Sequence, residues 1–157
     1  MSTRTNLTKF WRLAPSDRGL FFRSMLLLAM TGISLRLVSF RRIQVLLNPV
    51  NLAAGKALSS IEAAAKARQT ARIVAAAARH GAYRVNCLPT SLVLRYLLLR
   101  QGIQADLRVG VRKADDGRLD AHAWVEHAGQ PLIDRFDVGQ RFSPFDQPIH
   151  PSKVASG

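Results

Sequence analysis

The residues of this chain that are best suited to chemistry are a cysteine, a histidine and an aspartate in its C-terminal half. Cys87 is the single cysteine, and His122 and Asp134 follow it along the chain in that order. A thiolate attacks a carbonyl carbon, an imidazole takes and returns the proton, and a carboxylate holds the imidazole in one orientation. These residue types, in this order, predict a cysteine peptidase or a cysteine acyltransferase.

Cys87 stands where the sequence predicts the start of a helix. Pro89 is tolerated in an α-helix only in its first turn, so the helix should begin within a residue or two of Cys87 and run to Gly102. The N-terminus of a helix favours the thiolate form of a cysteine. Two interpretations of Cys87 stay open: an activated nucleophile, or a small side chain that fills the start of a buried helix. Asn86 is either the N-cap or an oxyanion donor, for which the backbone N–H of Cys87 is the other candidate.

Short strands should follow this helix. Residues 105–111 alternate between apolar and polar side chains, which is typical of a strand with one buried face. Residues 115–117 have turn composition, and residues 121–128 and 131–136 are then expected to form a hairpin. Helices followed by antiparallel strands predict an α+β domain, in which the helix of Cys87 packs on an antiparallel sheet.

The register of this hairpin decides whether His122 meets a carboxylate. A three-residue loop at 127–129 sets His122 opposite Asp134, whereas a two-residue turn at 128–129 sets it opposite Arg135. Three-residue loops with glycine at the last position are common, so the pattern permits a His–Asp pair without requiring it.

Two other carboxylates compete with Asp134 for the role of orienting His122. Asp137 lies three residues further along, where the strand is expected to have ended. Glu126 shares a strand face with His122 but lies two residues away on the same strand, which is a poorer position for an orienting group. Asp134 ranks first, with Asp137 as the alternative.

A metal site is the remaining chemical interpretation of these residues. It would use Cys87, His122, His127 and an aspartate, but the sequence has no HExxH motif and no paired His or Cys spacing. A single cysteine also excludes an internal disulfide framework. We therefore expect neither a metal nor a cofactor, and a reducing cytoplasm is the simpler setting for the thiol.

The positive charge of the chain is concentrated in its first two-thirds. Residues 1–100 contain 16 Lys or Arg against two acids, a net charge of +14, whereas residues 101–157 contain seven basic and eight acidic residues, a net charge of −1. Such a surface attracts nucleic acid, anionic lipid or an acidic polypeptide, or it is simply the exterior of an Arg-rich protein. No zinc-finger, phosphate-loop or RNA-binding motif is present, so a nucleic-acid partner is not expected.

The domain organisation is expected to be a basic, apolar helical region over residues 1–50 and a core over residues 51–157. In the first region, Ser16 is the expected N-cap of one or two helices that extend to about residue 47. Its apolar stretch, residues 24–35, falls short of the roughly 20 residues that span a bilayer, although a peripheral membrane contact stays open. In the core, residues 57–80 predict an alanine-rich helix that ends at Gly81.

Several segments of the chain resemble the leader peptidase of lasso-peptide biosynthesis, a transglutaminase-like, papain-related cysteine peptidase. The resemblance covers roughly residues 60–136 and is specific in its Cys–helix–strand–HAWVE order. The segments that carry it are Asn86-Cys87-Leu88, Ser91-Leu92, Leu97 to Ile103, Val109-Gly110-Val111 and His122-Ala123-Trp124-Val125-Glu126. Where that family often has Arg-Ala after Cys-Leu, this chain has Pro89-Thr90, a departure that concerns substrate fit more than chemistry.

The resemblance implies a role for each residue and a set of partners. It implies a catalytic triad of Cys87, His122 and Asp134, and thereby selects Asp134 over Asp137. It implies removal of the leader from a ribosomally made lasso-peptide precursor, with a separate leader-recognition protein that delivers the substrate and an ATP-dependent cyclase that acts next. We expect the N-terminal helical region, residues 1–50, to dock such a partner or the leader itself. A transglutaminase-like acyltransferase and a non-catalytic basic module that binds membrane or nucleic acid are the alternatives.

Overall fold

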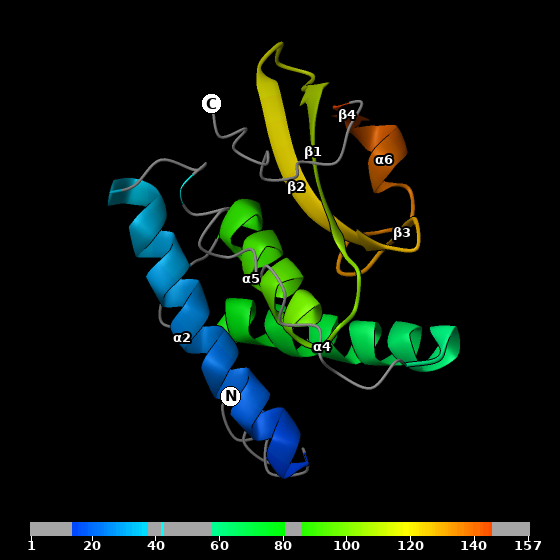
Figure 1. Ribbon diagram of the computed structural model, residues 1–157. Coiled ribbons are helices and arrows are strands. Elements are labelled where there is room, and N and C mark those ends of the chain that lie inside the picture. The colour runs from blue at the N-terminus through cyan, green and yellow to red at the C-terminus, as the bar shows by residue number, and fades with distance from the viewer. Residues whose placement is uncertain (1–13, 38–41, 43–57, 81–85, 146–157) are drawn as a thin grey trace, which may run out of the picture.

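Helices come first in this fold, and a curled antiparallel sheet follows them (Figure 1). The computed structural model describes residues 14–37, 42, 58–80 and 86–145. The elements are α2 (Pro15–Leu37), α4 (Ser60–His80), α5 (Cys87–Arg100), β1 (Asp106–Lys113), β2 (Leu119–His127), β3 (Gln130–Pro131), α6 (Val138–Arg141) and β4 (Ser143–Pro144). The sheet has the order β3-β2-β1-β4. The expectation of an α+β domain is confirmed.

Helix α2 begins one residue before the expected N-cap. Pro15 is its first residue, a position that suits proline because a first-turn N–H has no partner within the helix. Ser16 therefore lies inside the first turn, and the prediction that it caps the helix is wrong. Asp17 does lie in the first turn, and it accepts hydrogen bonds from Gln69 Nε2 of α4 at 2.9 and 3.0 Å. Most of the helix expected beyond residue 37 lies outside the described residues.

Helix α2 is also longer than its apolar stretch suggested. It has 23 residues, and an 18-residue stretch of it has a mean hydropathy of 1.5. By length and composition alone it could cross a membrane, which corrects the expectation that it is too short. One face of the helix is nevertheless buried in the protein, through Ser24, Leu28 and Thr31. The Ser24 hydroxyl donates to the carbonyl of Leu20 at 2.7 Å, so this buried polar group is satisfied.

Helix α4 begins at a capping box rather than at the start of the alanine-rich segment. The Glu62 backbone N–H donates to Ser59 Oγ at 3.3 Å, and the Ser59 backbone N–H and hydroxyl donate to Glu62 Oε2 at 3.0 and 2.7 Å. These hydrogen bonds to the ionised form lower the pKa of Glu62. The helix starts at Ser60, three residues later than the expected 57, and Gly81, its expected terminator, lies outside the described residues.

Helix α5 is the central element of the core. It contacts β1 and β2 as well as α2 and α4, and it lies between α2 and the sheet (Figure 1). Its end follows the prediction: Gly102 has φ +75°, and the N–H of Ile103 donates to the carbonyl of Leu98 at 3.0 Å. The side chains buried along α5 are Pro89, Ser91, Leu92, Val93, Leu94, Arg95, Leu97 and Leu98. Because α5 is buried on most sides, its position is fixed, and so is the position of its first residue, Cys87.

Candidate active site

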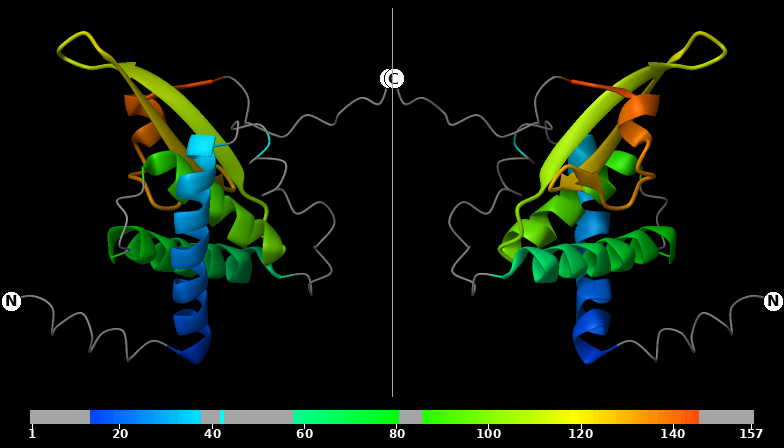
Figure 2. Two further views of the ribbon diagram at one scale, coloured as in Figure 1. Left: turned by 90° about the vertical axis from the view of Figure 1, so that its left-hand side faces the viewer. Right: turned by 90° about the vertical axis from the view of Figure 1, so that its right-hand side faces the viewer.

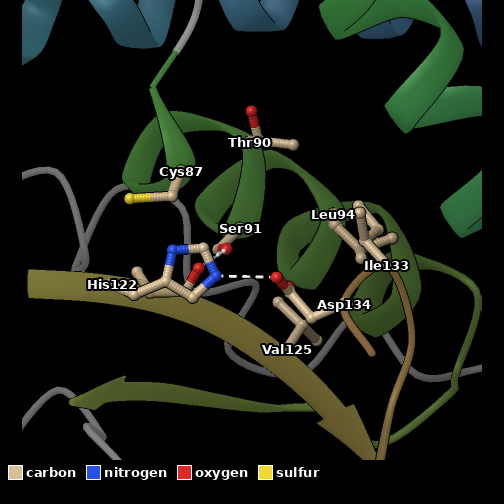
Figure 3. A pocket seen from close by; sticks show the side chains of 9 residues that line it. Cys87, Thr90, Ser91, Leu94, His122, Val125, Ile133 and Asp134 are labelled. Atoms are coloured by element: carbon tan, nitrogen blue, oxygen red, sulfur yellow. Dashed lines mark hydrogen bonds and ion pairs between the residues drawn. The ribbon is translucent and has the colours of Figure 1, made fainter. Parts of the chain in front are cut away.

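Cys87, His122 and Asp134 line one shallow cavity between α5 and β2 (Figure 3). Cys87 is the first residue of α5, His122 lies within β2, and Asp134 belongs to the segment that follows β3. The imidazole lies between the sulfur and the carboxylate. The cavity has a volume of about 120 Å³, and its other lining residues are Thr90, Ser91, Leu94, Ala123, Val125 and Ile133.

The thiol stands at the N-terminus of its helix, as Pro89 predicted. Asn86 occupies the N-cap position with extended backbone (φ −71°, ψ 172°), but its side chain makes no capping hydrogen bond. Pro89 contributes no N–H to this first turn. The backbone N–H groups of Cys87 and Leu88 are therefore the first donors of the helix, and the positive end of the helix dipole lies at the sulfur, where it stabilises a negative charge.

His122 is held by a short hydrogen bond and by two aromatic rings. Its Nε2 lies 2.7 Å from Asp134 Oδ1, with the two side chains 23 % and 24 % exposed. The imidazole is nearly parallel to Trp124 at a centroid distance of 6.2 Å, and it lies 5.0 Å from the ring of Phe142. An ionised carboxylate only accepts hydrogen bonds, so the proton of the neutral imidazole lies on Nε2. The other nitrogen, Nδ1, lies on the side of Cys87 and is left as a base (Figure 3).

The hairpin that precedes Asp134 has a two-residue turn. Ala128 and Gly129 have φ angles of +50° and +74°, the left-handed pair that a tight hairpin requires, and His127 pairs with Gln130. The three-residue loop does not form. In this register a continued ladder would set His122 opposite Arg135.

Asp134 nevertheless reaches His122, because the ladder ends before it. Strand β3 consists of Gln130–Pro131, and the pairing ends where the Leu132 N–H donates to the Val125 carbonyl at 3.0 Å. The expected strand over residues 131–136 is therefore wrong beyond Pro131. The chain bends over residues 132–134 and is free of the strict alternation of a strand, so the carboxylate of Asp134 turns toward Nε2.

The helix of Cys87 is fixed to the strand of His122 by a buried hydrogen bond. The hydroxyl of Ser91, which is 5 % exposed, donates to the carbonyl of Ala123 at 2.9 Å. Ala123 is the neighbour of His122, so this bond joins the start of α5 to the strand that carries the imidazole. Sequence reasoning did not identify this contact, which depends on the tertiary packing of α5 on β2.

A second buried contact anchors α5 further along. The Nε of Arg95, a residue that is 7 % exposed, donates to the carbonyl of Ala105 at 3.2 Å, just before β1. Burial lowers the pKa of Arg95, and the negative charge of Asp106 acts in the opposite direction. A buried guanidinium of this kind joins α5 to the start of the sheet.

Gly110 of β1 leaves space for Phe142 and for the Trp124 ring, the two aromatic residues beside His122. It pairs with His122 across β1 and β2, and a Cβ atom on it would lie 2.9 Å from Ser143 O and 3.1 Å from both Phe142 Cβ and Trp124 Cη2. The guanidinium of Arg112 lies 4.9 Å from the centroid of the Phe142 ring. A glycine inside an alternating strand pattern is the sequence signal for such a close approach.

The competing carboxylates are engaged elsewhere. Glu126 accepts hydrogen bonds from Trp124 Nε1 at 2.8 Å and from Arg108 Nε at 3.1 Å. Asp137 Oδ1 is buried and accepts no hydrogen bond, but it forms an ion pair with Arg135 Nε at 3.5 Å. These partners identify Asp134 as the carboxylate that is hydrogen-bonded to the imidazole.

His127, the other histidine considered as a metal ligand, does not join the cavity. Its Nδ1 lies 2.7 Å from the carbonyl of Gln104. Among the described residues, no group of three or more His, Cys, Asp or Glu side chains is arranged to hold a metal ion.

Comparison with models of protein families gives one match, to the family described as "Transglutaminase-like superfamily", over residues 27–146. The matched region contains α5, the whole sheet and all three side chains of the cavity. Neither a curated protein nor a solved structure matches the chain significantly.

Proposed function

Because this chain belongs to the transglutaminase-like superfamily, we propose that it is a cysteine peptidase that removes the leader from a ribosomally made lasso-peptide precursor. The superfamily comprises, in general, Cys-His-Asp enzymes with peptidase or acyltransferase activity. The observation that carries the proposal is the cavity in which Cys87 lies at a helix N-terminus beside an imidazole hydrogen-bonded to Asp134. The finer assignment to lasso-peptide leaders is supported by the resemblance of the Asn86-Cys87-Leu88 and His122-to-Glu126 segments to that peptidase.

The proposed mechanism assigns one step to each group. His122 Nδ1 takes the proton of the Cys87 thiol, and the thiolate attacks the carbonyl carbon of the peptide bond between leader and core. The backbone N–H of Cys87 donates to the oxyanion of the tetrahedral intermediate. As this intermediate collapses, the imidazolium gives its proton to the departing amine of the core peptide, which leaves the leader as a thioester on Cys87. Water, deprotonated by His122, hydrolyses that thioester, and Asp134 keeps the imidazole in one orientation throughout.

The size of the cavity favours delivery of the substrate by a partner. About 120 Å³ is well below the roughly 300–1,000 Å³ of pockets that enclose a whole ligand, so the cavity holds only the residues next to the scissile bond. We propose that a separate leader-recognition protein supplies the remaining affinity, and that an ATP-dependent cyclase acts on the released core. A free thiol nucleophile suits the reducing cytoplasm, which we propose as the location.

Leader release by the purified protein tests this proposal. The protein is incubated with a lasso-peptide precursor and the leader-recognition protein, and the products are identified by mass spectrometry. Wild-type protein should release an intact leader and core, and Cys87→Ala should release neither while it keeps the circular dichroism spectrum of the wild type. Normal cleavage by Cys87→Ala would overturn the mechanism.

The acyltransferase alternative is resolved in the same experiment. With a labelled primary amine present, a peptidase yields a leader with a free C-terminal carboxylate, because water is the acceptor of the acyl group. An acyltransferase yields the amide of the labelled amine as its main product.

A further inference from the structure

Helix α2 carries a stripe of large apolar side chains that are exposed in the described part of the protein. At 100° per residue, the stripe lies on the opposite side of the helix from the buried residues Ser24, Leu28 and Thr31. Helix α2 contacts α4 and α5, and Figure 2 shows it crossing α4. The members of the stripe are 53–79 % exposed although all are large and apolar: Phe22, Leu26, Met30, Ile33 and Leu37. They are spaced three or four residues apart, so they recur on one side of the helix at every turn.

The stripe is continuous and lacks polar groups. At 3.6 residues per turn, its five side chains fall within an arc of about 80° along a helix about 34 Å long. Its side chains are hydrocarbon or thioether groups with no N–H or O–H. A continuous exposed apolar surface of this kind marks an interaction site.

The borders of the stripe are basic. Arg23 lies on one border, and Arg18 and Arg36 lie on the other. The single acid of α2, Asp17, projects to the opposite side, where it accepts the hydrogen bonds of Gln69. This local pattern agrees with the net charge of +14 over residues 1–100.

We propose that this stripe binds the surface of an anionic lipid bilayer, with α2 lying in the plane of the interface. An apolar face bordered by arginine fits this partner, because the side chains of the stripe enter the acyl region while the exposed guanidinium of Arg23 meets the phosphates of the headgroups. A fluid acyl phase requires no hydrogen-bond partner from the stripe, whereas a specific protein interface carries polar contacts that fix its register.

The packing of α2 determines its orientation to the membrane. Although α2 is long and apolar enough to span a bilayer, its other face is buried against α4 and α5 through Ser24 and Thr31. A spanning helix would have to leave that packing, whereas a helix in the plane of the interface keeps it. Because α5 lies between α2 and the sheet, the cavity of Cys87 stays on the protein side of the interface (Figure 1). The proposal is independent of the proposed peptidase function.

Sedimentation with lipid vesicles tests this surface directly. Wild-type protein is mixed with vesicles of phosphatidylcholine alone or of phosphatidylcholine with phosphatidylglycerol, and the bound fraction is measured. The double variant Leu26→Ser/Met30→Ser keeps every charge and removes two exposed side chains from the middle of the stripe. Ile61→Ser, at a residue of α4 that is 80 % exposed, is the matched control outside the stripe.

Binding should be confined to the anionic vesicles and should weaken as salt is raised. The double variant should bind about tenfold more weakly or worse, and Ile61→Ser should bind as the wild type does. Arg23→Gln, which leaves all apolar groups in place, should also bind the anionic vesicles more weakly. This variant replaces the double variant in the test if the double variant does not fold. Equal binding by wild type and double variant would reduce the effect to the general positive charge and overturn the proposal. The proposal would also be overturned if the wild type did not bind lipid and instead formed a dimer, or a complex with the leader-recognition protein, that the double variant did not form.

Discussion

Replacing Asp134 by asparagine isolates the contribution of its negative charge. The amide has nearly the same shape as the carboxylate, so the fold should be retained while the 2.7 Å contact with His122 Nε2 changes character. In the proposed mechanism, this contact stabilises the imidazolium that forms when the thiol loses its proton. In the variant a neutral partner replaces the charge.

The expected loss has two parts. A hydrogen bond to a charged group contributes about 1.5–3 kcal/mol, and because the two side chains are 23 % and 24 % exposed, solvent screening places the loss near the lower end, about tenfold in rate. The amide of asparagine also donates a hydrogen bond to Nε2, so the proton of the neutral imidazole moves to Nδ1. A protonated Nδ1 can no longer accept the thiol proton. Together these effects predict a fall in kcat of about a hundredfold or more.

The assay is the rate of leader release at saturating precursor and leader-recognition protein. Asp137→Asn is the matched control, because Asp137 is the nearby carboxylate that contacts Arg135 rather than His122. Its kcat should change by less than about fivefold. An unchanged rate in Asp134→Asn, or an equal loss in Asp137→Asn, would refute the assignment of the orienting carboxylate.

Three further variants test the supports of the site and of the fold. Ser91→Ala should leave the carbonyl of Ala123 without its buried donor, lowering the free energy of unfolding in urea by about 1–3 kcal/mol and reducing kcat; an unchanged stability would contradict the role of this bond. Gly110→Ala should lower both the melting temperature and kcat, because the new Cβ would lie 2.9 Å from Ser143 O; a melting temperature equal to that of the wild type would show that the packing tolerates the Cβ. The capping interaction lowers the pKa of Glu62, so the stabilisation is present above the unfolded-state pKa, near the ordinary value of 4.5, and is lost as the pH falls through the lower folded-state value. The melting temperatures of wild type and Glu62→Gln should therefore differ at pH 7 and converge in acid, whereas a constant difference would contradict the capping role.

The position of the thiol could be predicted from the sequence because local chemistry determines it. Proline restricts where a helix can begin, and Pro89 therefore placed Cys87 in the first turn before any tertiary contact was known. The Ser59-to-Glu62 capping box was equally visible in the sequence, but the alanine-rich segment drew the predicted start to residue 57.

The position of Asp134 could not be predicted in the same way. Two- and three-residue hairpin turns differ little in sequence, and the register argument assumed that the strand continues to residue 136. The strand ends early, and the carboxylate reaches His122 from outside the ladder. The hydrogen bond from Ser91 to Ala123 and the exposed stripe of α2 likewise depend on how α5 packs against β2 and α2, which no local pattern encodes.

The central claim is that Cys87 carries the acyl group of the leader during cleavage. The direct measurement is the intact mass of the protein in reactions quenched with acid after short times, followed by localisation of the adduct by peptide mapping. The account predicts a protein heavier by the acylated leader, with the adduct on the peptide that contains Cys87 and none in Cys87→Ala. Leader release at the full wild-type rate from protein whose Cys87 has been alkylated would contradict it.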